Sequence, residues 1–165
     1  MDSKGFTLFE ILITAAILSA IMGGIFMVLD TGDKTYALDA GLMDLQQSAR
    51  QSMNAMVREL HGAISQTITG GGSGINFNTT GATGVQYYCN ADNQLVREFP
   101  SGSTPAVVGN SISVLSFCCW HDDTGTCTTD CTGSNLIEIN LTASSTVRGR
   151  DISFPLKGQA RPRNE

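Results

Sequence analysis

The sequence predicts an α+β fold in which a long N-terminal helix packs on a small antiparallel β-sheet domain with a disulfide-held loop. Three observations predict it. Residues 6–29 form an apolar run, a helical repeat of apolar residues continues to about residue 66, and Gly, Ser, Thr and β-branched residues dominate beyond it. This change from helical to strand-like composition places the division between the two parts near residue 67.

Length and composition exclude several classes of protein. The chain has 165 residues, enough for one domain or for a small domain with a long extra element. Ten Lys and Arg against 15 Asp and Glu give a net charge of −5, so we expect no nucleic-acid partner. Hydrophobic residues make up 41%, too many for a disordered chain. With only 2 His and no evident nucleophile–base pair or phosphate loop, we expect neither an enzyme nor a cofactor.

The apolar run at residues 6–29 is long enough to cross a membrane. As a helix it spans about 36 Å, against about 30 Å for a hydrocarbon core. Cleaved secretory signals have a basic leader and a shorter apolar core, whereas residues 1–5 here carry one Lys and one Asp. A plain anchor explains the length but not Glu10, since a carboxylate in a membrane segment costs roughly 2.5–3.5 kcal/mol.

Cleavage between Gly5 and Phe6 would give Glu10 a partner. The cut creates an α-amine that is cationic over much of the physiological pH range. Between two parallel helices staggered by a few residues, the Glu10 carboxylate of one chain can meet the Phe6 amine of the next. A mispaired subunit would leave a buried charge unpaired, so the pairing sets register as well as affinity. Glu10 is therefore the predicted assembly residue.

The segment Lys4-Gly5-Phe6-Thr7-Leu8-Phe9-Glu10 resembles the type III signal of bacterial type IV pilins and pseudopilins. The resemblance implies a type IV pilin-like fold. It also implies that a prepilin peptidase cuts after Gly5, methylates the new terminus at Phe6 and requires Glu10. The implied partners are the prepilin peptidase, the inner membrane and the N-terminal helices of other pilin or pseudopilin subunits.

A departure from the family pattern favours a minor subunit. Major pilins commonly carry a proline in the second half of the apolar run, where this chain has Met27. Without that proline, the pair Gly23 and Gly24 is the predicted weak point of the helix. Residues 34–60 are similar to the corresponding part of PilW-type minor pilins.

A second helical segment follows the apolar run. Apolar residues recur there at intervals of three and four, so one face of the helix must be buried against a domain: Leu38, Leu42, Leu45, Ala49, Met53, Met56, Leu60 and Ile64. The predicted organisation is therefore a leader at 1–5, a membrane or filament-core half-helix at 6–29, an amphipathic half-helix at 30–66 and an extracytoplasmic β domain at 67–165.

Five strands are predicted in the C-terminal part, and the first two flank a turn at residues 90–93. Partial alternation of apolar and polar residues indicates that one sheet face lies on the helix stripe. The small core of such a domain is often reinforced by cross-links. The predicted strands are 85–89, 94–99, 111–119, 136–142 and 152–156.

Five cysteines are the most unusual feature of this part: Cys89, Cys118, Cys119, Cys127 and Cys131. Pilin topology would place them outside the cytoplasm, where disulfides persist. Adjacent cysteines of a strand point to opposite faces and seldom pair with each other. We expect Cys118 and Cys119 to pair with Cys127 and Cys131 in either order, leaving Cys89 free. The alternative in which Cys89 pairs with Cys118 or Cys119 frees a different thiol.

A metal site and a calcium loop are weaker interpretations of the same region. His121 with the neighbouring cysteines could bind a metal, but the spacing is irregular and lacks C-x-x-C, so we expect none. The segment 121–126 with Asp130 lacks the alternating acids and terminal Glu of an EF-hand. Acidic residues in a turn between strands explain it more simply.

These observations predict a minor pilin, a structural subunit that primes or caps a type IV pilus. Two alternatives stay open: a J-type minor pseudopilin at the tip of a type II secretion system, and a tip adhesin that binds through the loop at 118–131. In each case the chain would cross the inner membrane once, with its N-terminus in the cytoplasm. It would then enter a periplasmic or cell-surface filament.

Overall fold

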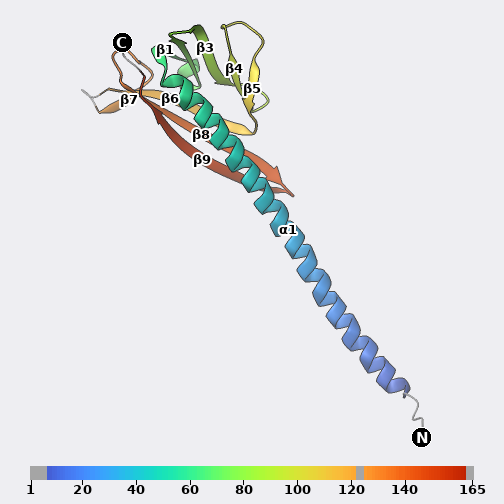
Figure 1. The fold of residues 1–165 in the computed structure, drawn as a ribbon. Helices are drawn as coiled ribbons and strands as arrows, with labels where there is room; N and C mark the ends of the chain where they lie inside the picture. The colour runs from blue at the N-terminus through green and yellow to red at the C-terminus, as the bar shows by residue number, and fades with distance from the viewer. Residues whose placement is uncertain (1–6, 122–124, 163–165) are drawn as a thin grey trace. The chain divides into compact units, whose positions relative to one another are not determined.

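The computed structural model describes residues 7–121 and 125–162 (Figure 1). Within these residues, helix α1 (Leu8–Leu60) is followed by nine strands and one short 3₁₀ turn. The chain divides into two compact units, the first ending at Asp39 and the second beginning at Ala40. The α+β class predicted from the sequence is confirmed.

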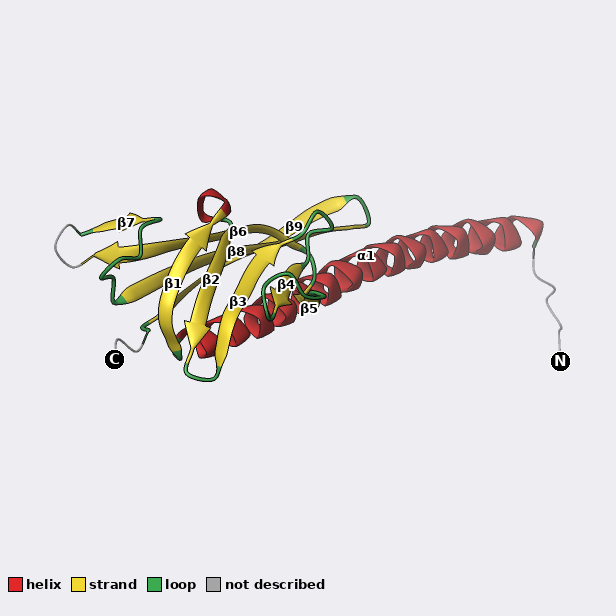
Figure 2. Ribbon diagram, turned by 90° about the horizontal axis from the view of Figure 1, so that it is seen from above, coloured by secondary structure: helices red, strands yellow, loops and turns green. Residues whose placement is uncertain are grey.

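The second unit holds two antiparallel sheets. Sheet A has the order β1-β2-β3-β4-β5, with the bounds β1 (Ala63–Thr69), β2 (Gly74–Thr79), β3 (Ala82–Cys89), β4 (Leu95–Glu98) and β5 (Ala106–Gly109). Sheet B has the order β7-β6-β8-β9, with the bounds β6 (Ile112–His121), β7 (Thr126–Thr128), β8 (Leu136–Val147) and β9 (Arg150–Ala160). In Figure 2 strands β1, β2 and β3 lie in one layer and the long strands of sheet B in another.

One hydrophobic core joins the last turns of α1 to both sheets. The helix contributes a stripe of buried residues at intervals of three and four, as its periodicity predicts: Leu45, Ala49, Met53, Met56 and Leu60. Phe77 and Tyr87 from sheet A and Phe117 from sheet B are at most 2% exposed. This arrangement places the amphipathic face of the helix against the sheets, so burial of apolar area holds the unit together.

The helix ends earlier than its apolar periodicity predicts. It stops at Leu60 rather than near residue 66, and Gly62 follows, its N–H bonded to the Glu59 carbonyl. Ile64 continues the helical spacing, but it belongs to β1, where Thr67 and other β-branched residues favour a strand. Antiparallel pairing with β2 makes this segment a strand, and the local spacing of apolar residues does not reveal such pairing.

Strands β3, β4, β6, β8 and β9 correspond to the five predicted strands, and β1, β2, β5 and β7 were missed. The turn predicted at 90–93 is confirmed: Asn90 Oδ1 accepts the N–H groups of Asp92 and Gln94. A run of three glycines turns β1 into β2. Gly70, Gly71 and Gly72 there have φ of 59°, 68° and 113°, values that favour glycine.

Candidate functional site

The first unit begins with a capped helix end. Thr7 precedes α1, and its hydroxyl oxygen accepts the backbone N–H of Glu10 at 3.3 Å. Threonine before a helix supplies an acceptor to N–H groups that lack a partner in the first turn. Helix α1 begins at Leu8, directly after this cap, so Glu10 lies in its first turn. Gly5 and Phe6, the predicted processing residues, lie outside the described residues.

The large apolar side chains of α1 from Leu8 to Leu29 are exposed. They range from 44% exposed at Ile13 to 78% at Leu8. By length and composition, α1 is the one helix among the described residues that could cross a membrane. So much exposed apolar surface is unfavourable in water and needs lipid or other helices around it.

The polar side chains of this segment are satisfied by their own helix. The hydroxyls of Thr14, Ser19 and Thr31 donate to backbone carbonyl oxygens at 2.8–3.0 Å, each three or four residues earlier. Such internal bonds let hydroxyl groups sit in apolar surroundings without an unsatisfied donor. Glu10 differs, because none of the ion pairs found among residues 7–121 and 125–162 includes its carboxylate.

Gly23 and Gly24 lie in the middle of the apolar segment, and α1 is continuous through them. Beyond the adjoining residues and backbone of the helix itself, a Cβ atom added at either position would meet no atom within 4 Å. Contacts within the chain therefore do not require glycine there. Their role as a weak point of the helix stays a prediction.

Two disulfides hold the far end of sheet B. Cys118 pairs with Cys127 and Cys119 pairs with Cys131, with Cα–Cα distances of 5.4 and 5.1 Å. This is one of the two pairings of these four cysteines that the sequence left open, and it produces the predicted disulfide-held loop. Cys89 is free, and its Sγ donates to the Ile112 carbonyl at 3.0 Å. Desolvation raises the pKa of the Cys89 thiol, which favours its protonated form.

The four cysteines at this end are all in disulfide bonds, so none of them offers a thiolate to a metal ion. The Sγ atoms of Cys118 and Cys127 and a carboxylate oxygen of Glu138 lie within 4.8 Å of one another. Both sulfurs, however, are in a disulfide bond, so neither is a thiolate ligand. His121 Nε2 is hydrogen-bonded to the Asp130 carbonyl at 2.7 Å. Residues 122–124, part of the segment weighed above as a calcium loop and interpreted as an acidic turn, lie outside the described residues.

Glu138 is a buried acid that the sequence analysis did not single out. Its carboxylate accepts hydrogen bonds from Trp120 Nε1 at 3.0 Å and Asn140 Nδ2 at 3.2 Å, and Lys157 Nζ lies 2.8 Å away. Desolvation raises the pKa of this carboxyl, but these three donors outweigh that effect and the pKa lies below its usual value. A sequence feature that could have marked Glu138 as buried is its place between Ile137 and Ile139 in a strand-like pattern.

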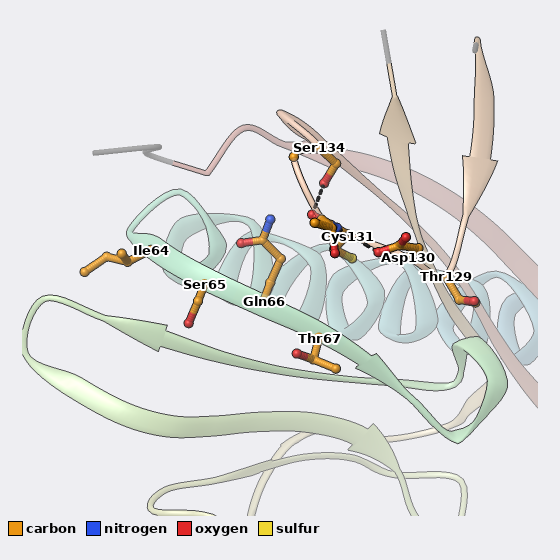
Figure 3. Close-up of a pocket in the computed structure, with 10 residues that line it drawn as sticks. Ile64, Ser65, Gln66, Thr67, Thr129, Asp130, Cys131 and Ser134 are labelled. Carbon is orange, nitrogen blue, oxygen red and sulfur yellow. Dashed lines mark hydrogen bonds between the residues drawn. The ribbon is translucent and has the colours of Figure 1, made fainter. Parts of the chain in front are cut away.

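A groove runs between strand β1 and the segment that follows β7. It encloses about 320 Å³ and is lined by residues 64–67 on one side and residues 129–134 on the other (Figure 3). The Gln66 side chain points from β1 toward Cys131, and its Oε1 is buried without a hydrogen-bond partner among the described residues. No local pattern marks Gln66, because the groove forms only when the sheets come together.

Comparison with protein families identifies the N-terminal segment. Residues 1–26 match the family model described as the prokaryotic N-terminal methylation motif. Searches of curated proteins and of solved structures find no match. The family match supports the prepilin-type signal of type IV pilins and pseudopilins predicted from residues 4–10. Such a signal implies processing by a prepilin peptidase and assembly with other pilins, and with the apolar helix it fits membrane anchoring before assembly.

Proposed function

Given the prepilin-type signal, we propose that this chain is a minor pilin, a structural subunit that primes or caps a type IV pilus. The proposal depends on one observation above all: the large apolar side chains of α1 from Leu8 to Leu29 are exposed, and one acid, Glu10, lies in the first turn of this helix. An apolar helix with an unpaired carboxylate is suited to a membrane and then to a bundle of similar helices. Type IV pilins act as structural proteins, not as catalysts.

The proposed mechanism starts with cleavage after Gly5 and methylation of the Phe6 amine. In the membrane, the Glu10 carboxylate of one subunit meets the Phe6 amine of a neighbour staggered along the helix axis. A correct stagger pairs the two charges, and a wrong one leaves both unpaired in a medium of low dielectric constant. The pairing therefore selects one register while the apolar faces supply contact area.

A substitution of Glu10 tests this mechanism. Glu10→Gln keeps the size of the side chain but removes its charge, so we expect insertion into the membrane to persist while the amount in sheared filaments falls. Asp33→Asn, an exposed acid of the same helix without an ion pair in the described structure, is the matched control. Immunoblots of membranes and of sheared filaments from cells lacking the native gene measure both quantities. Normal incorporation of Glu10→Gln would contradict the mechanism.

Terminal sequencing tests the processing step independently of assembly. Mature protein from cells should begin at a methylated Phe6. Protein that still begins at Met1 would remove the basis of the proposal. A deletion strain then separates a pilus subunit from a type II secretion pseudopilin, since the first loses surface filaments and the second loses secretion of exported proteins.

A further inference from the structure

The four edge strands of the two sheets differ in how they are protected against pairing with another chain. Strands β5 and β7 are short, with 4 and 3 residues. Strand β9 is long, but it carries Pro155 and Lys157, residues that hinder the addition of a further strand. Strand β1 has 7 residues, AISQTIT, with neither charge nor proline.

Strand β1 also has an open side. It is the terminal strand of sheet A and, among the described residues, it pairs with β2 alone. Its pairing is irregular only at the start, between Ala63 and Ser65. The groove adjoins this strand along four consecutive residues. Backbone groups at the spacing of a β-strand recognise another extended chain better than they recognise a compact small molecule.

The opposite wall of the groove is held in place before any partner binds. Cys131 is tied to Cys119 of β6, and the Cys131 carbonyl accepts the Ser134 hydroxyl at 3.1 Å. Asp130 Oδ1 accepts the Thr132 N–H at 2.9 Å. A wall that is already ordered loses little conformational freedom on binding, so more of the contact energy appears as affinity.

The groove offers two further features to a peptide. Gln66 Oε1 is a buried acceptor that lacks a donor in the described structure, and a peptide N–H or a side-chain donor would satisfy it. Asp130 is an exposed carboxylate whose pKa is lowered by the Thr132 N–H, so it is anionic at physiological pH. Both features favour a segment that brings hydrogen-bond donors and a basic side chain.

We propose that the free edge of β1 and the disulfide-held wall at residues 129–134 bind an extended segment of a neighbouring filament subunit, which adds to sheet A as an extra strand. This inference rests on the proposed function, because it takes its partner from the assembled filament. It would join subunits outside the helical bundle. The two disulfides then serve to shape the binding groove as well as to stabilise the domain.

Cross-linking in intact filaments tests the proposal with the full chain. Ile64 lines the groove and is 44% exposed, and it is replaced by the photo-cross-linker p-benzoylphenylalanine. Val107, 52% exposed on edge strand β5 of the same sheet, receives the same replacement as the control. We expect illumination to join Ile64, and not Val107, to one segment of a subunit, identified by mass spectrometry of sheared filaments.

A blocking substitution tests the role of the strand edge. Thr67→Lys places a charge on β1, so the Ile64 adduct should be lost while both disulfides and the thermal midpoint stay unchanged. Thr83→Lys, an exposed threonine of β3, should leave the adduct intact. If Thr67→Lys does not fold, the comparison of Ile64 with Val107 in the otherwise native chain still decides.

Three outcomes overturn the proposal: incorporation without an Ile64 adduct, equal adducts at Ile64 and Val107, and an adduct that persists in folded Thr67→Lys. In all three the chain is present in filaments, so the proposed function stands. If immunoblots show no chain in sheared filaments, the proposed function fails and the groove proposal fails with it.

Discussion

Two acids, Glu10 and Glu138, sit in contrasting surroundings. Glu138 is buried, and its carboxylate accepts hydrogen bonds from Trp120 and Asn140 and forms an ion pair with Lys157, all within its own sheet. Glu10 lies on an exposed apolar helix and has no ion-pair partner among the described residues. The fold therefore satisfies one carboxylate internally, and the proposed function supplies a partner for the other from a second chain.

The pH dependence of stability provides a test at Glu138. Its pKa is lowered in the folded state, so its contribution is complete above the unfolded pKa of about 4.3 and is lost as the pH falls through the lower folded value. We expect the free energy of unfolding to decline below about pH 5. In Glu138→Gln this decline should be smaller, because the side chain no longer titrates. Urea unfolding between about pH 7 and pH 3 measures it.

The control for this prediction is Asp92→Asn, at an exposed acid in the turn between β3 and β4. This variant should keep the native decline of stability with falling pH. An unchanged pH slope in Glu138→Gln would show that the buried carboxylate makes no such contribution.

Between elements, close packing of α1 on the sheets depends on small residues. Gly109 of β5 faces Ser52 and Ser48 of the helix, and an added Cβ would lie 3.2 Å from the Ser52 Cβ. The Ser48 hydroxyl donates to the Asn110 carbonyl at 3.1 Å and so requires this close approach. Glu59 of the helix also holds β4, with Arg97 Nε at 2.9 and 3.0 Å from its two carboxylate oxygens.

A methyl group at Gly109 tests this contact. Gly109→Ala should lower the free energy of unfolding by about 1–3 kcal/mol, because the added Cβ clashes with Ser52. Ser52→Ala in the same chain should restore part of the loss, since it removes the hydroxyl that the new Cβ meets first. The control is Gly81→Ala, where an added Cβ meets nothing within 4 Å. Equal unfolding midpoints for both alanine variants would contradict this account of the packing.

For the whole molecule, the two units have different requirements. The second unit, which begins at Ala40, encloses the hydrophobic core, whereas the large apolar residues of the first unit up to Leu29 are exposed. The first unit therefore needs an environment that the chain does not supply. In the proposed function, cleavage after Gly5 prepares the chain for a filament.

Replacement of the predicted cleavage residue tests this step. Gly5→Leu should block the peptidase by steric bulk, so the protein keeps residues 1–5 and is excluded from filaments. Ser3→Leu adds the same bulk away from the cleaved bond and should leave processing unchanged. Intact-mass measurement of protein purified from membranes distinguishes the two forms. A mature mass for Gly5→Leu would place the cut elsewhere.

Sequence patterns anticipated the features that depend on neighbours along the chain. The apolar run with Glu10, the buried stripe from Leu45 to Leu60 and the turn at 90–93 each follow from local spacing. Strand β2 was missed although Ile75 and Phe77 alternate, because two buried residues are too few to separate a strand from a loop. The first part of strand β1, up to Gln66, was assigned to the helix because Ile64 continued the helical spacing.

The prepilin-type signal, the long helix and the cysteines near residues 118–131 can be identified without a structure, since each is a local property of the chain. The pairing of the cysteines, the end of the helix and the groove beside Gln66 are seen only in the folded protein. These features depend on strands that are far apart in the sequence and associate in one register. Burial of apolar area in a shared core stabilises that association.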